Sequence, residues 1–389
     1  MITVKIINKL IYFINAFDFF AKFLYYKHRL SRGVLHKADQ ALIQKCVRAF
    51  IMENKKSILK PTTLTEQLTI LKKRNIIVPP QYETVLLQYG YYNLINGYKD
   101  PFIDKVKSNK LGQDYYKDGT SLQHIVELYR FDALLRQNLL YCIVTVETQI
   151  KSLISLHFSL RFGSSHWEYL TPNSFTKSPS KQYHVNKLIN TLQTSISKFQ
   201  NEKKHPAICH FMNTYNQVPL WVLNTIMEFG KMSNFYDDLP DDMQKTIAKE
   251  INPNLTPKKL ISILYYLTSI RNKCAHNNRL YIHKMDQRAS RVSMIPQLLI
   301  HQELNIPYND KINQYQYGQD DILAAILCLS VFFDQTKMFV IDYEGIETSL
   351  RNLSKNIPND AAVFVREITG LHENILKQLH KKYGETVKQ

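Results

Sequence analysis

The stretch TSLQHIVELYRFDALLRQNLLYCIVTVETQIKSLISLHFSL, which runs from Thr120 to Leu160, organises the fold of this 389-residue chain. Its apolar residues recur every three or four positions, at Ile125, Leu128, Tyr129, Leu135, Leu139, Ile143, Val146 and Ile150. Because that period places side chains on one face of an α-helix, the stretch predicts one long amphipathic helix or two helices in line. Thr120 or Ser121 can cap its start.

Charged residues interrupt this apolar pattern at a few positions. Asp132 and Arg136 are four positions apart, a spacing at which side chains can pair on one helix face. Glu147 lies in an otherwise apolar stretch, so it needs a partner if it is buried.

Composition extends the helical prediction to the rest of the chain. Only 11 Gly and 14 Pro occur, which is few turn formers, and a hydrophobic share of 44% allows a sizeable core. We therefore predict an all-α protein. We expect a main helical domain over residues 56–345, an N-terminal helical extension over residues 1–55, and a lysine-rich helical extension over residues 346–389.

Cysteine usage and hydropathy indicate a cytoplasmic protein without a membrane span. The five cysteines are widely spaced and form no Cys-x-x-Cys pair, which is typical of a reducing compartment. The apolar run KLIYFINAFDFFAKFLYY is interrupted by Asn15, Asp18 and Lys22, and a spanning helix needs about 20 mostly apolar residues. An amphipathic helix packed on the body is the main interpretation, and a peripheral membrane anchor is the weaker one.

The charge balance indicates a polyanionic partner. The chain has 50 basic and 33 acidic residues, a formal net charge of +17. Such an excess favours binding to nucleic acid or to an anionic membrane surface. The alternative is a solvated, lysine-rich surface without a binding role.

A second helical pattern ends in an unusual polar cluster. Thr256 and Pro257 form a natural helix start, and the apolar stripe after them ends at Cys274, which we interpret as a core residue. The segment RNKCAHNNRLY runs from Arg271 to Tyr281. Asn272 and His276 are spaced four apart and are neighbours on another face of the helix. The alternative for His276 is a surface histidine at a helix C-terminus, where cations are favoured.

These residue types suit phosphodiester cleavage by acid–base chemistry. His276 can move a proton between a ribose 2′-OH and the leaving oxygen. Arg271 can neutralise charge on the phosphoryl oxygens, and Asn272 can hold the imidazole or a phosphate oxygen. RNA supplies its own nucleophile, so we expect no metal and no cofactor, and products with a 2′,3′-cyclic phosphate and a 5′-OH. His205, Cys209 and His210 lie close together but lack a second ligand cluster, so a metal site is not expected there.

The same Arg-to-His spacing occurs at Arg161 and His166. There it crosses the turn sequence FGSS, and no asparagine comes after the arginine. Only the pair of Arg271 and His276 lies at the end of a long apolar helix, which favours that pair as the site.

The segment RNKCAHNNRLY resembles the R-N-x3-H motif of HEPN ribonucleases, and more specifically the motif that closes the domain in Abi-like abortive-infection proteins of the AbiD/AbiF type. Four further segments match that family in order between Lys60 and Tyr281. They are KPTTLTEQLTILKKR, YYNLINGYKDPF, DGTSLQHIVELYRFDALLRQ and PLWVLNTIMEFGKMS. The family's glutamate four residues after the tryptophan is Thr225 here, so any role of that glutamate is in doubt.

The resemblance implies a HEPN-like helical bundle and catalysis on RNA by Arg271 and His276, supported by Asn272. It also implies a homodimer with a composite cleft and a role in anti-phage abortive infection or as a toxin, with a small antitoxin or regulatory RNA as a second partner. The competing arrangement is a second motif at Arg161–His166 within one chain, as in the related type VI CRISPR effectors. The alternative function is a HEPN-like module that binds RNA without cutting it.

Five further residues are candidates for binding RNA. Lys273, Asn278 and Arg279 adjoin the motif, and Tyr98 and Lys99 belong to a tyrosine-rich block before Phe102. Aromatic residues beside lysines can stack on bases. Packing in the core is the alternative for Tyr98.

Overall fold

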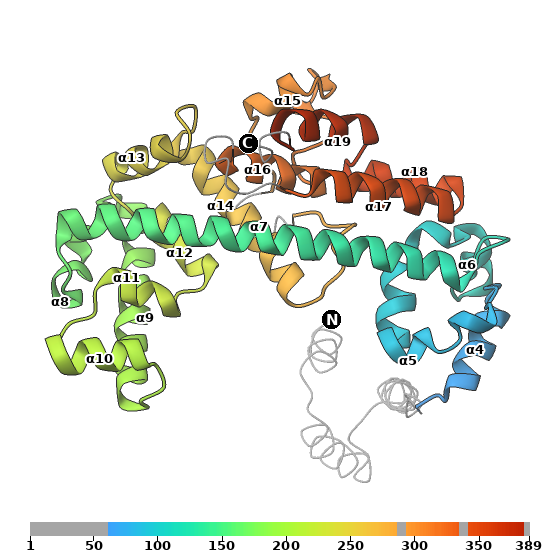
Figure 1. Ribbon diagram of the computed structural model, residues 1–389, viewed down its shortest axis with the longest axis horizontal. Coiled ribbons are helices and arrows are strands. Elements are labelled where there is room, and N and C mark those ends of the chain that lie inside the picture. Colours follow the sequence, from blue (N-terminus) through green and yellow to red (C-terminus); the bar gives the residue numbers. More distant parts are fainter. Residues whose placement is uncertain (1–60, 286–292, 334–340, 385–389) are drawn as a thin grey trace, which may run out of the picture. The chain divides into compact units, whose positions relative to one another are not determined.

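The computed structural model describes residues 61–285, 293–333 and 341–384. The chain divides into two compact units, Met1–Thr63 and Leu64–Gln389, and the described helices and strands belong to the second unit. The described residues are predominantly helical, which confirms the all-α prediction (Figure 1). The predicted N-terminal extension, and with it the membrane-anchor alternative, lies outside the described residues.

The stretch quoted first forms one continuous helix, α7 (Leu122–Phe162), the long green helix of Figure 1. Ser121 is its cap: the Ser121 hydroxyl accepts the N–H of Gln123 at 3.2 Å, and the Ser121 N–H donates to His124 Nδ1 at 3.2 Å. Gly163 ends the helix with φ +80°, a conformation that glycine adopts without the steric cost of a Cβ. Of the two sequence alternatives, the structure therefore has the single long helix.

The core assembles around α7. Its predicted apolar stripe is buried apart from the half-buried Tyr129. Burying one large aliphatic side chain contributes roughly 1.5–3 kcal/mol, so a stripe of this length is a large share of the core. The helices packed on α7 include α14 (Pro257–Ala275), α16 (Ile322–Phe333), α17 (Tyr343–Asn356), α11 (Leu220–Leu223), α12 (Phe229–Asp237) and α13 (Asp241–Ile251).

Short helices precede α7. They are α4 (Leu64–Lys73), η1 (Pro80–Tyr82), α5 (Val85–Tyr89), the π-helix η2 (Tyr92–Asn96), η3 (Asp100–Phe102) and α6 (Lys105–Leu111). Isolated bridges join Ile77 to Ser121 and Ile103 to Tyr116. The tyrosine-rich block folds against the first turns of α7, because η2 packs on α7 and the rings of Tyr89 and Tyr98 contact that of Tyr129.

The remaining helices between α7 and α14 are also short, apart from α9. They are α8 (His166–Tyr169), η4 (Pro172–Ser174), η5 (Pro179–Lys181), α9 (Gln182–Asn201), α10 (Pro206–Tyr215) and η6 (Asn224–Ile226).

The C-terminal part continues the same compact unit. Its elements are α15 (Leu299–Glu303), the antiparallel strands β1 (Tyr308–Asn309) and β2 (Gln314–Tyr315), α16, α17, α18 (Asn359–Thr369), α19 (Glu373–Leu379) and η7 (His380–Gly384). Because α17 begins at Tyr343 and packs on α7, the chain after residue 345 adds to the central layer of the second unit.

By length and composition alone, α7 is the one described helix that meets the criteria for a membrane span. A helix at the centre of a protein core meets the same criteria. The expectation of no membrane span therefore stays a prediction.

Candidate functional site

The candidate site lies where α14 ends. The Thr256 hydroxyl caps the start of α14 by accepting the N–H of Lys259 at 3.3 Å, and Pro257 occupies the first turn, as predicted. His276 is the C-terminal cap residue. The Asn277 N–H donates to Cys274 O at 3.2 Å and the Asn278 N–H to Lys273 O at 2.9 Å. This pattern is a Schellman turn, with Asn277 in the left-handed position at φ +52° where glycine is commoner.

The other face of α14 belongs to the core. Its predicted apolar stripe is buried throughout, at Leu260, Ile263, Leu264, Leu267, Ile270 and Cys274. Burial raises the pKa of the Cys274 thiol to about 12, so this cysteine stays protonated and is not a nucleophile at neutral pH. The helix end is therefore anchored by its apolar face, which leaves the polar face for a ligand.

The Arg271 guanidinium is held from α7. Its side chain is 29% exposed, and its Nε lies 3.7 Å from Glu147 Oε2. Glu147 is mostly buried and also pairs with Lys151 Nζ at 2.8 Å, so it has the partners that its apolar surroundings require. Arg271 Nη1 contacts Asn272 Oδ1 at 3.5 Å. Arg271 is therefore directed by one carboxylate and keeps donors for an anion.

The His276 side chain is exposed and has no hydrogen bond or ion pair with any described residue. Asn272 and Asn278 are exposed as well, and Lys273 is half-buried. The structure thus brings an imidazole, two carboxamides and two basic side chains to one helix end.

The other predicted RNA-binding residues have partners within the protein. The Arg279 guanidinium donates to Gly97 O at 2.9 Å and to Asp100 Oδ2 at 3.3 Å. Lys99 Nζ pairs with Asp114 at 2.6 Å. Tyr98 is 1% exposed, and its ring lies against those of Tyr129 and Tyr281. Tyr98 has no free ring face for a base, so packing is its role in this structure.

A buried polar network that sequence reasoning did not identify lies behind the helix end. The spacing of Asp132 and Arg136 predicted an ion pair, and the two side chains are paired and buried. The Asp132 carboxylate also accepts the backbone N–H groups of Leu280 and Tyr281 and the hydroxyl of Tyr98. The sequence shows an Asp–Arg pair in an apolar helix. It does not indicate that the pair binds the backbone of the segment after α14.

The second Arg-to-His pair is arranged differently. Arg161 Nη1 pairs with Asp242 at 2.6 Å. His166 is 2% exposed, and its Nδ1 accepts the Val218 N–H at 3.0 Å. Burial lowers the pKa of His166. This pair therefore does not present an exposed imidazole beside an arginine.

His205, one of the two histidines near Cys209, has structural contacts. The His205 side chain caps α10 by accepting the Ile208 N–H, and its Nε2 lies 3.4 Å from Thr225 Oγ1. Within residues 61–285, 293–333 and 341–384, no cluster of three or more His, Cys, Asp or Glu side chains could hold a metal ion.

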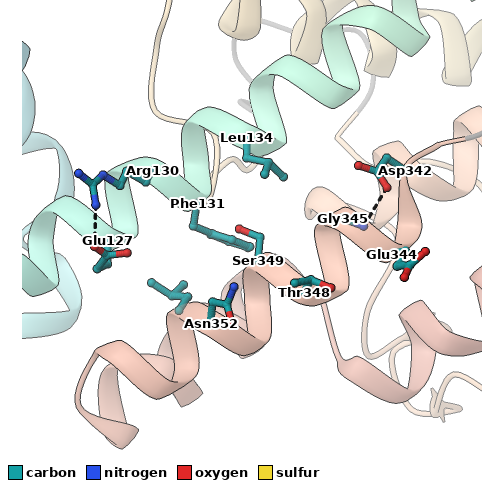
Figure 2. Close-up of a pocket in the computed structure, with 11 residues that line it drawn as sticks. Glu127, Arg130, Phe131, Leu134, Asp342, Glu344, Gly345, Thr348, Ser349 and Asn352 are labelled. Carbon is teal, nitrogen blue, oxygen red and sulfur yellow. Dashed lines mark hydrogen bonds and ion pairs between the residues drawn. The ribbon is translucent and has the colours of Figure 1, made fainter.

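A groove of ≈ 540 Å³ lies between α7 and α17 (Figure 2). Its wall includes the ion pair of Glu127 and Arg130, at 3.0 Å, and the Asp342 side chain, which accepts the Gly345 N–H. None of the candidate residues lines this groove.

Comparison with known proteins identifies a family. The sequence model of a family described as Abi-like protein matches residues 84–282, just over half of the chain. No curated protein and no solved structure matches the chain. The matched range contains all of α7, all of α14 and the helix end with Arg271 and His276.

Proposed function

This chain belongs to the Abi-like protein family, and on that basis we propose that it is a HEPN-type endoribonuclease of the AbiD/AbiF kind. The observation that carries the proposal is the exposed His276 imidazole, close after Arg271 in the chain, at a helix end that is anchored from the core.

The proposed reaction uses the RNA's own 2′-OH as nucleophile. The 2′ oxygen attacks the adjacent phosphorus while the bond from phosphorus to O5′ breaks, which gives a 2′,3′-cyclic phosphate and a 5′-OH. His276 accepts the 2′-OH proton, and an imidazolium returns a proton to the leaving O5′. Arg271 neutralises the charge on the non-bridging oxygens, and Asn272 donates to one of them. Atoms and protons balance without a metal or cofactor.

We propose that two copies act together as a homodimer. From Gln137 to Leu160 every exposed residue of α7 is uncharged, and Val144, Leu156 and Leu160 are between 45% and 76% exposed. An uncharged face is unusual in a chain with a net charge of +17, and it suits contact between two like-charged copies. Val144 lies one turn from Glu147, which holds Arg271, so such a dimer would bring two candidate sites near each other.

The biological setting we propose is abortive infection against phage, or a toxin in a toxin–antitoxin pair, in the cytoplasm. The net charge of +17 supports binding of a substrate RNA and of a small regulatory RNA.

The test is cleavage of total cellular RNA in EDTA by protein stripped of copurified RNA. Wild type, His276→Ala and His210→Ala are compared, because His210 is an exposed histidine far along the chain from the site and serves as the matched control. We expect cleavage with cyclic-phosphate ends from wild type and His210→Ala only. Tight RNA binding without cleavage by wild type would favour the non-catalytic binding module instead.

A further inference from the structure

One carboxylate in the N-terminal third of α7 joins three separate segments of the chain. Asp132 is 0% exposed. Its Oδ1 accepts the Tyr281 N–H at 2.6 Å and the Leu280 N–H at 3.2 Å, and its Oδ2 accepts the Tyr98 hydroxyl at 2.7 Å. The Arg136 guanidinium pairs with the same carboxylate and donates to the Tyr98 hydroxyl at 3.0 Å.

These hydrogen bonds hold two backbone amides in place and do more than pack side chains together. Burying a carboxylate is costly unless it is paired and hydrogen-bonded, and here every partner is in place. Two of these partners are consecutive amides directly after the candidate site. Because hydrogen bonds to a charged acceptor are roughly twice as strong as neutral ones, the carboxylate determines where residues 280–281 lie.

The His276 side chain depends on that backbone. Its imidazole has no hydrogen-bond partner among the described residues, so the main chain on either side is what places its Cα–Cβ bond. Before it lies the end of α14. After it, the turn at Asn277 leads within three residues to Leu280, whose N–H Asp132 binds. Arg279 adds a second anchor through its bond to Gly97 O.

We infer that Asp132 is a positioning residue for RNA cleavage, which from the core fixes the segment 277–281 and thereby aims His276 at the substrate. This inference rests on the proposed function. It assigns Asp132, Arg136 and Tyr98 to the site although all three are buried away from substrate.

The experiment compares Asp132→Asn and Tyr98→Phe with Tyr169→Phe. Asp132→Asn keeps the shape but removes the charge. Tyr98→Phe removes one hydroxyl bonded to Asp132. Tyr169→Phe is the matched control, because the Tyr169 hydroxyl is equally buried and donates to Val218 O at 2.7 Å, outside the network. Cleavage kinetics and amide hydrogen exchange are measured on each full-length, folded variant.

We expect Asp132→Asn to lower kcat by about tenfold or more while KM for RNA stays within about twofold, since the change acts on alignment rather than on binding. Tyr98→Phe should lower kcat by about threefold, and Tyr169→Phe should leave it unchanged. The amides of Leu280 and Tyr281 should exchange faster in Asp132→Asn and at the wild-type rate in Tyr169→Phe.

A folded Asp132→Asn with wild-type kcat would overturn the inference and leave the proposed function intact. Unchanged exchange at Leu280 and Tyr281 would overturn it as well. If Asp132→Asn does not fold, Tyr98→Phe decides: equal kcat in Tyr98→Phe and Tyr169→Phe rejects the positioning role. A wild type that cleaves no RNA would overturn the proposed function and this inference with it.

Discussion

Arg161–His166 and Arg271–His276 have the same spacing, and the fold gives them opposite surroundings. Arg161, in the last turn of α7, forms an ion pair with Asp242, and His166 is buried with its Nδ1 accepting the Val218 N–H. Arg271 lies near the end of α14 beside a buried carboxylate, and His276 is exposed without a partner among the described residues. The spacing between an arginine and a histidine therefore does not by itself predict an exposed pair.

The difference arises from the residues that come after each arginine. After Arg161 the helix stops at Gly163, and the chain turns so that His166 begins α8 and packs inward. After Arg271 the helix continues to Ala275, which keeps His276 at the helix surface. A histidine that completes a core hydrogen bond cannot also transfer protons to a substrate. Of the two pairs, Arg271–His276 is therefore the one with an exposed imidazole for the proposed cleavage.

The sharpest test of this contrast replaces each histidine. We expect His276→Ala to lower the single-turnover cleavage rate by about 10² to 10⁴, the range for a lost acid–base residue, with unfolding free energy unchanged within about 0.5 kcal/mol. His166→Ala should keep cleavage but lose about 1–3 kcal/mol of stability, because the Val218 N–H is left without an acceptor. Equal cleavage by wild type and His276→Ala would remove the contrast.

Replacing the arginine of each pair tests the same contrast a second way. Arg271→Ala should lower cleavage about 10²-fold through loss of transition-state charge stabilisation. Arg161→Ala removes an ion pair whose side chains are 46% and 71% exposed, so we expect at most about 1 kcal/mol in stability and unchanged cleavage. Denaturant unfolding and cleavage assays measure both effects, and a large cleavage defect in Arg161→Ala would point to a second motif within one chain.

Measuring unfolding and cleavage as a function of pH distinguishes the exposed histidine from the buried ones. His283 is 2% exposed, and burial, with smaller contributions from Lys273 and Lys284, lowers its pKa to about 3. In the unfolded chain His283 binds a proton near pH 6.5, and in the folded chain it does not. The free energy of unfolding is therefore highest above pH 6.5 and declines as the pH falls below it. From pH 7 to pH 5, the free energy of unfolding falls by about 2 kcal/mol because of His283.

We therefore expect His283→Leu to flatten the pH dependence of unfolding by that amount and leave the pH profile of cleavage in place. His166 acts in the same direction, since burial lowers its pKa too. Urea unfolding at pH 5, 6 and 7 is the measurement, and an identical slope in wild type and His283→Leu would contradict the expectation.

The smallest expected effect concerns the carboxylate under Arg271. Glu147→Gln keeps the shape but weakens the tether at 3.7 Å, so cleavage should fall by about tenfold, less than for loss of Arg271 itself. Glu344→Gln is the control, because Glu344 is an exposed carboxylate of α17, outside the face of α7 proposed for the dimer. Cleavage equal in Glu147→Gln and wild type would show that α14 alone positions the guanidinium.

Local sequence patterns are enough to predict the helical elements and the neighbourhood of the candidate site. The period of the apolar residues in α7 and α14, the caps at Ser121 and Thr256, and the core role of Cys274 come from local chemistry, because helix periodicity and capping depend on residues within a few positions. The cluster of Arg271, Asn272 and His276 was visible for the same reason.

The packing of distant segments, by contrast, determines which polar residues are free. Tyr98 and Lys99 looked suitable for RNA, but Tyr98 is enclosed by rings from α7 and from the segment after α14, and Lys99 is paired with Asp114. Asp132 looked like half of a helical ion pair, and its backbone partners, Leu280 and Tyr281, lie 148 and 149 residues away. A local pattern cannot specify such contacts, because they depend on how the tertiary fold brings segments together and on which buried groups each must satisfy.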